Sequence, residues 1–196
     1  MIRRRRARAV RAVNLDVGHM PHNQLTPQAT AAFNARFDEI LGGIEKDVLA
    51  ITQHFNARGL LYCSERVHKI YQRIDEAIAE MSKAASESVR RAYEAGHHSF
   101  SESLESELLD AFEGNFSSGF QRLCAVRIGA TQPVRDGLSN NQMLENDEHL
   151  RVARRAQIQG QLELRQYFQA LKRARKRWYE YIPFVAKLVI SLFKSH

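Results

Sequence analysis

The sequence has little cysteine, and its two cysteines lie far apart. Neither Cys63 nor Cys124 has a second cysteine close to it in the chain. This spacing excludes a CxxC zinc half-site and a dense disulfide framework. We expect both cysteines to be reduced, buried and apolar in character, and the sequence predicts neither a metal site nor a cofactor.

The sequence also lacks a long apolar run. No window of about 18 uninterrupted apolar residues occurs, which argues against an ordinary membrane-spanning helix. The N-terminus is positively charged but has no apolar segment of a secretory signal, and its first serine is Ser64, unlike a Ser-rich transit peptide. Because the hydrophobic fraction is 44%, near the globular average, we expect a folded intracellular protein that is soluble or peripherally attached to a membrane.

Charge is divided unevenly along the chain. Residues 1–26 carry six Arg against one Asp, residues 151–196 carry eleven Lys and Arg against two Glu, and residues 27–150 carry 12 basic and 19 acidic residues. Both ends are therefore basic and the middle is acidic. Such ends can fold onto the body, contact another copy head to tail, or bind a polyanion.

Apolar residues recur every three or four positions, which is typical of amphipathic helices. A first helix is expected from Thr26 as N-cap, with Pro27 after it, to a stop at Arg58-Gly59. Gly42-Gly43 predicts a kink in it or a close approach of another helix. Its apolar stripe is Phe33, Phe37, Ile40, Ile44, Val48, Ile51 and Phe55.

Two further helices follow the same pattern. The second starts near Ser64 and ends at Gly96, and the third has Ser101 as N-cap. Gly129 to Asn141, which contains Pro133, is predicted to be a loop. The apolar stripes of these helices include Ile70, Ile74, Ile78, Met81, Ala85 and Val89, then Leu104, Leu108, Phe112, Phe116, Phe120 and Leu123.

The stretch from Asn141 to Pro183 is helical in pattern and would be about 60 Å long if unbroken. Because this exceeds a compact bundle, it either bends near Gly160 or projects. Ala153, Ala156 and Gly160 form a small-residue face that lets another helix approach closely. Pro183 is expected to open a separate short helix.

These patterns predict an all-α protein with an antiparallel bundle of three or four long helices. Residues 1–25 are expected to be a flexible basic arm. Residues 26–181 form the bundle with its long final helix, and residues 182–196 form an apolar amphipathic helix.

The C-terminal segment has cations first, then aromatic residues, then an apolar helix, the order expected at a membrane surface. From Tyr181 to Phe193 it is about 20 Å long, shorter than the roughly 30 Å hydrocarbon core, so one copy would lie in the interface. Burial against the bundle or a sister subunit is the alternative. The candidate binding residues are Lys172, Arg173, Arg175, Lys176, Arg177, Trp178, Tyr181, Phe184, Lys187, Leu188, Leu192 and Phe193.

The basic arm is a candidate polyanion-binding segment, since clustered arginines can neutralise several phosphates. No zinc finger, GxxG loop or RRM signature accompanies it, so sequence specificity would come from shape or from a partner. The arginines concerned are Arg3, Arg4, Arg5, Arg6, Arg8 and Arg11.

Two patterns bear on enzymatic chemistry. Glu-x-x-His occurs at Glu65/His68 and Glu94/His97, but both fall on one predicted helix about 43 Å apart, which excludes a dinuclear metal centre. Arg91 followed by His97 resembles the Arg-(four to six residues)-His pattern of the HEPN ribonucleases. The resemblance implies an all-α fold and RNA cleavage by Arg91 and His97 at a dimer interface. The polar residue usual after the Arg is here Ala92.

The sequence favours a non-enzymatic, self-assembling docking protein that engages an anionic surface, above all a membrane, through its basic and aromatic C-terminus. A subunit of a phage particle or of a bacterial defence complex fits this description. The alternatives are a nucleic-acid-binding helical protein that uses the arm, and a HEPN-like ribonuclease.

Overall fold

The computed structural model describes residues 24–96, 101–135 and 142–194, with the side chains of residues 24–96, 101–131 and 149–176. These residues form four helices, α1 (Leu25–Ala57), α2 (Ser64–Gly96), α3 (Glu102–Arg135) and α4 (Gln142–Lys194). No strand occurs within the described ranges. The all-α prediction is confirmed.

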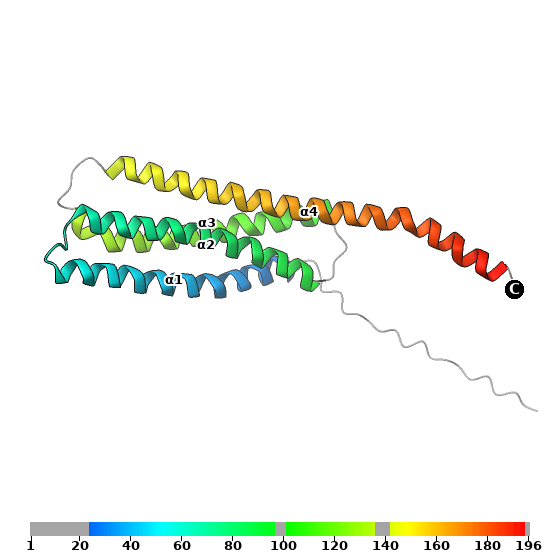
Figure 1. Cartoon of the computed structure of the whole chain (residues 1–196), viewed down its shortest axis with the longest axis horizontal. Coiled ribbons are helices and arrows are strands. Elements are labelled where there is room, and N and C mark those ends of the chain that lie inside the picture. Colours follow the sequence, from blue (N-terminus) through cyan, green and yellow to red (C-terminus); the bar gives the residue numbers. More distant parts are fainter. Residues whose placement is uncertain (1–23, 97–100, 136–141, 195–196) are drawn as a thin grey trace, which may run out of the picture.

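Consecutive helices run antiparallel in a bundle (Figure 1). α2 packs against each of the other three helices, and α3 packs against α1 and α4. α1 and α4 therefore lie on opposite sides of the α2–α3 pair (Figure 1). Each helix contributes one apolar face to a single core, as the sequence periodicity predicts.

The predicted apolar stripes form that core. Every predicted position on α1 is buried except Ile51, which is partly buried against the core. The Phe33 and Phe37 rings stack with their centroids 5.4 Å apart. The largest fully buried side chains are Phe33, Phe37, Phe55, Phe112, Phe168, Leu25, Ile44, Ile70, Ile74, Ile78, Met81 and Leu104.

Two glycines allow α3 and α4 to approach the middle of α2. A Cβ atom at Gly119 would lie 2.5 Å from the Met81 sulfur, and one at Gly160 would lie 2.7 Å from the Ser82 hydroxyl oxygen. The Ser82 hydroxyl donates a hydrogen bond to the Ala156 carbonyl oxygen at 2.7 Å. The predicted small-residue face of α4 is thus a site of close helix approach.

Local capping signals place several helix ends correctly. Gly59 has a positive φ of 66°, and the Leu60 N–H donates to the Phe55 carbonyl oxygen at 2.9 Å, which is the Schellman arrangement. Ser101 caps α3, since its hydroxyl oxygen accepts the Leu104 N–H at 3.2 Å.

The predicted N-cap of α1 is wrong. α1 begins at Leu25 with Gln24 as N-cap, and Gln24 makes no side-chain capping bond. The Thr26 hydroxyl instead donates to the Glu107 carboxylate of α3 at 3.0 Å. The Thr26 hydroxyl thus bonds to a carboxylate of another helix and does not cap a backbone N–H of α1. The expected close approach at Gly42-Gly43 is also absent, because a Cβ atom at either glycine meets nothing within 4 Å.

The loop predicted from Gly129 to Asn141 is wrong in its first part, because α3 continues past Pro133 to Arg135. Arg66 of α2, only 2% exposed, donates to the Ala130 carbonyl oxygen at 3.3 Å. A cation near the C-terminal end of a helix complements its dipole. Packing on α2 therefore extends α3 beyond its local stop signals.

α4 is much longer than its neighbours. Its 53 residues span about 80 Å, against about 50 Å for the other helices. Of the two arrangements that the sequence allowed, α4 projects past the end of the bundle (Figure 1). It runs through Pro183 to Lys194 as one helix, so the separate helix expected at Pro183 is not present. Its final part bends (Figure 1), and proline bends a helix because it lacks an N–H.

Both cysteines are free, but they are half-buried rather than buried as expected. Burial raises the pKa of the Cys124 thiol, although Arg127 acts in the opposite direction. The thiol of Cys124 therefore holds its proton at neutral pH.

The close approach at Gly160 yields a stability prediction. Gly160→Ala should lower the free energy of unfolding by about 1–3 kcal/mol, because the added methyl group overlaps Phe112 and Ser82. Gly42→Ala is the matched control and should raise it by about 0.5–1 kcal/mol through helix propensity alone. Urea unfolding of both variants measures the difference, and equal effects would contradict the close packing.

Candidate functional site

The outer face of α4 is strongly basic. Among the α4 residues whose side chains are described, cations outnumber carboxylates by eight to one, the single acid being Glu163. All eight cations are exposed to solvent. They are Arg151, Arg154, Arg155, Arg165, Lys172, Arg173, Arg175 and Lys176.

Large apolar side chains are interspersed among these cations. Leu150, Ile158 and Leu162 are 55%, 50% and 49% exposed. Ile158 and Leu162 lie between Arg155 and Arg165 at helical spacing, so all four share the face that points away from the bundle. We call the exposed cations Arg151, Arg154, Arg155, Arg165, Arg173 and Lys176 the α4 basic face. None of the six forms an ion pair with a carboxylate in the described part of the chain.

A cluster of aromatic rings fixes α4 where it reaches the end of the bundle. Tyr167 and Phe168 of α4 pack edge-on against Tyr93 of α2, with centroid separations of 6.3 and 6.2 Å. The Tyr167 hydroxyl donates to the Glu94 carboxylate at 3.0 Å, and the Arg90 guanidinium lies 5.4 Å from the Tyr167 ring centroid. Burial raises the pKa of both tyrosines, and the Glu94 contact raises that of Tyr167 further.

Lys172 forms an ion pair between α4 and the bundle. Its ammonium lies 2.7 Å from the Glu105 carboxylate of α3, and this contact raises the pKa of Lys172. Arg173, the next residue, and Lys176, one turn further along, are exposed. The basic segment predicted from the sequence thus lies where α4 leaves the bundle (Figure 1).

Several predicted binding residues fall outside the described side chains. Those of the C-terminal segment are Arg177, Trp178, Tyr181, Phe184, Lys187, Leu188, Leu192 and Phe193. The arm residues Arg3, Arg4, Arg5, Arg6, Arg8 and Arg11 lie outside the described ranges, as does His97. The basic arm and the Arg91–His97 pair therefore remain predictions.

Arg91 itself is described. Its side chain is 78% exposed and lies 3.8 Å from the Glu87 carboxylate, one turn back on α2. It lines a shallow groove between α1 and α2 with Arg36 and Glu39. Arg91 thus pairs with Glu87 on a solvent-exposed face of α2.

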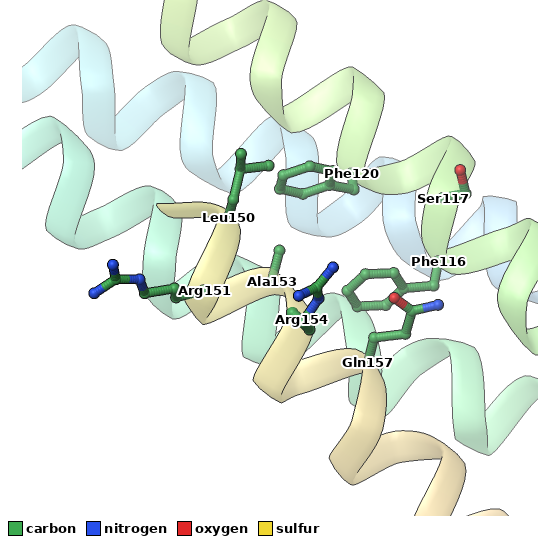
Figure 2. Close-up of a pocket in the computed structure, with 8 residues that line it drawn as sticks. All are labelled: Phe116, Ser117, Phe120, Leu150, Arg151, Ala153, Arg154 and Gln157. Atoms are coloured by element: carbon green, nitrogen blue, oxygen red, sulfur yellow. The ribbon is translucent and has the colours of Figure 1, made fainter. Parts of the chain in front are cut away.

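The sequence gives no signal for a groove between α3 and α4 (Figure 2). It has a volume of about 490 Å³, and Phe116, Phe120 and Leu150 line it. Figure 2 shows Arg154 and Gln157 beside the Phe116 ring, and Arg151 pointing away from it. The groove joins the α4 basic face, so it gives that face an apolar recess bordered by cations.

A polar pair with a buried histidine lies next to this groove. His149 is 4% exposed, and its Nδ1 atom lies 2.5 Å from the Asp75 carboxylate of α2. Its ring packs on Phe120 with a centroid separation of 5.8 Å, and its Nε2 atom has no hydrogen-bond partner among the described residues. The pair joins the start of α4 to α2. Two residues so far apart in sequence give no local signal of this contact.

Within the described ranges, no group of three or more His, Cys, Asp and Glu residues is placed to hold a metal ion. The described helices also include none whose length and apolar character would suffice to cross a bilayer. Comparisons with protein-family models, with curated proteins and with solved structures find no match to this chain.

The His149–Asp75 pair yields a second stability prediction. Asp75→Ala should lower the free energy of unfolding by about 1–3 kcal/mol, because it leaves the buried imidazole without its partner. Glu76→Ala is the control. It removes only an exposed contact to Arg73 and should change stability by less than about 1 kcal/mol. Urea unfolding at pH 7 compares them, and similar losses would show that the buried pair adds nothing.

The raised pKa of Tyr167 yields a prediction about alkaline pH. The unfolded phenol loses its proton near pH 10, as an ordinary tyrosine does, whereas the folded phenol keeps it to higher pH. Stability is therefore lost as the pH rises above about 10. Tyr167→Phe should make this fall shallower. Unfolding measured at pH 9 and pH 11 tests the difference, and identical slopes in both proteins would contradict it.

Proposed function

We propose that this chain is a non-enzymatic docking protein whose bundle holds α4 against an anionic surface, above all a phospholipid membrane. The projection of α4 beyond the bundle, with its basic side exposed, is the observation that carries the proposal (Figure 1). In this proposal the protein acts as a homo-oligomer, as a subunit of a larger assembly such as a phage particle or a bacterial defence complex.

The length of α4 supports this role. A helix that served only to complete the bundle would need about 50 Å, but α4 continues for about 30 Å more. The Tyr167 and Lys172 contacts hold α4 against α2 and α3 at the point where it leaves the bundle. The helix itself therefore carries the projecting segment, without an intervening loop. α4 thus places its terminal segment at a fixed distance from the bundle.

The chemistry of α4 favours a lipid surface over a nucleic acid. Cations attract anionic headgroups, and apolar side chains enter the boundary between headgroups and acyl chains. Ile158 and Leu162 expose about half of their surface between the cations of the α4 basic face. Contacts with phosphates alone would not require these exposed apolar side chains. The sequence of residues 178–193, aromatic and then apolar, continues the same combination.

Vesicle flotation tests the proposal. The full chain should float with vesicles that contain phosphatidylserine and stay behind with vesicles of phosphatidylcholine alone. Arg173→Glu/Lys176→Glu should weaken this binding about 30-fold or more, since each basic residue near an anionic surface contributes about 1 kcal/mol. Deletion of residues 183–196 should weaken it as well, and deletion of residues 1–11 should leave it intact.

Lys46→Glu/Lys83→Glu is the matched control, because it changes the net charge equally at exposed positions of α1 and α2. It should float like the native chain. If both double variants lost vesicle binding equally, the effect would come from net charge alone, and this would contradict a binding role specific to the α4 basic face. Binding that depends on residues 1–11 and moves from vesicles to RNA, with a steep salt dependence, would favour the nucleic-acid alternative.

A further inference from the structure

A polar groove lies between α1 and α3. It has a volume of about 450 Å³, and no residue of α4 lines it. Thr26, Thr30 and Asn34 border it on α1, and Glu107 and Asp110 border it on α3. The groove is therefore acidic and rich in hydroxyl and amide groups, unlike the basic surface of α4.

The two carboxylates of the groove lack cations. Glu107 is half-buried and accepts a hydrogen bond from the Thr26 hydroxyl at 3.0 Å. Neither Glu107 nor Asp110 forms an ion pair with any described cation. Since they lie three residues apart on one helix, their charges repel each other. A cationic occupant would remove this repulsion.

Asn115 provides an independent indication of an occupant. It lines the groove, it is only 3% exposed, and its Nδ2 atom has no hydrogen-bond partner in the described part of the chain. Buried polar groups are nearly always paired, because desolvation without a partner costs about 1–3 kcal/mol. The side-chain amide nitrogen is a donor, so the missing partner is an acceptor such as a carbonyl oxygen.

The floor of the groove is open beside Gly114. A Cβ atom built there meets nothing within 4 Å, and the next floor residue, Ala111, is small. A peptide backbone can approach such a floor closely. A small inorganic cation would satisfy the carboxylates but would leave the Asn115 amide without an acceptor. A peptide with arginine side chains supplies cations and carbonyl oxygens together.

We propose that the Arg-rich segment of this chain, residues 3–11, docks in the α1/α3 groove. Its arginines pair with Glu107 and Asp110, and its backbone carbonyls accept from Asn115. The connecting residues 12–24 can reach, since 14 extended residue steps from Arg11 to Leu25 span up to about 46 Å. The groove runs for only about 17 Å along α3, from Glu107 to Ser118.

This contact would mask the arginines of the arm until a competing polyanion displaces them. It goes beyond the proposed role of α4 and does not depend on it, because the two surfaces share no residue. If the chain failed to bind vesicles, the docking of the arm would not be contradicted. If the arm failed to dock, the membrane role of α4 would not be contradicted.

Limited trypsin digestion of the full chain, followed by mass spectrometry, tests the docking. Cleavage after Arg8 and Arg11 should be slow in the native chain. It should be about tenfold faster in Glu107→Gln/Asp110→Asn, which removes both charges. Gly114→Leu should accelerate it similarly, because Gly114 lines the groove and a Cβ atom there meets nothing within 4 Å, which leaves room for the leucine side chain to occupy the groove. Circular dichroism would establish that both variants stay folded.

Two control variants separate docking from general effects. Gly129→Leu places the same side chain at an open position of α3 outside the groove. Glu45→Gln/Glu65→Gln removes two exposed carboxylates elsewhere. Neither should change the cleavage rate. Equal rates in the native chain and in both groove variants would overturn the proposal. Protection that increases with protein concentration would also overturn it, because the arm in the groove would then belong to a second copy.

Discussion

The fold depends on two close helix contacts at the centre of α2. Met81 packs where α3 has Gly119, and the next residue, Ser82, packs where α4 has Gly160. Because successive residues on a helix point about 100° apart, one turn of α2 fixes two neighbours at once. α1 joins the same point through Phe33, whose ring would lie 3.0 Å from a Cβ atom at Gly119. The position of α4, and so of its basic side, follows from this crossing.

Periodicity and local capping predicted most of the fold. The stripe that begins at Phe33, the stop at Gly59 and the cap at Ser101 depend on neighbours within a few residues, and the structure agrees with each of them. The errors at the start of α1 and at the end of α3 have a different cause. Thr26 bonds to Glu107, and Arg66 bonds to Ala130 near the C-terminal end of α3, across distances in sequence that local patterns do not report.

The candidate surfaces divide in the same way. The cations of α4 could be found from the sequence, because charge composition and helical spacing place them on an exposed face. The groove at Phe116 and the His149–Asp75 pair could not, since each joins helices that only the fold brings together. Asn115 is similar: its residue type predicts exposure, and only the structure shows a buried amide without an acceptor.

Electrostatics connects these surfaces. Arg151 and Arg155 lie one turn apart, about 6 Å along the helix, which is within the screening length of about 8 Å at physiological salt. Their repulsion therefore persists at physiological salt. The described part of α4 contacts acidic residues of the bundle at Lys172–Glu105 and at His149–Asp75. Acidic residues that could neutralise α4 are instead used within α1 to α3, as in the contact of Asp47 with Arg73 at 2.7 Å. The six cations of the α4 basic face thus make no ion pair with a carboxylate in the described part of the chain, and this uncompensated charge is the electrostatic basis of the proposed contact with an anionic surface.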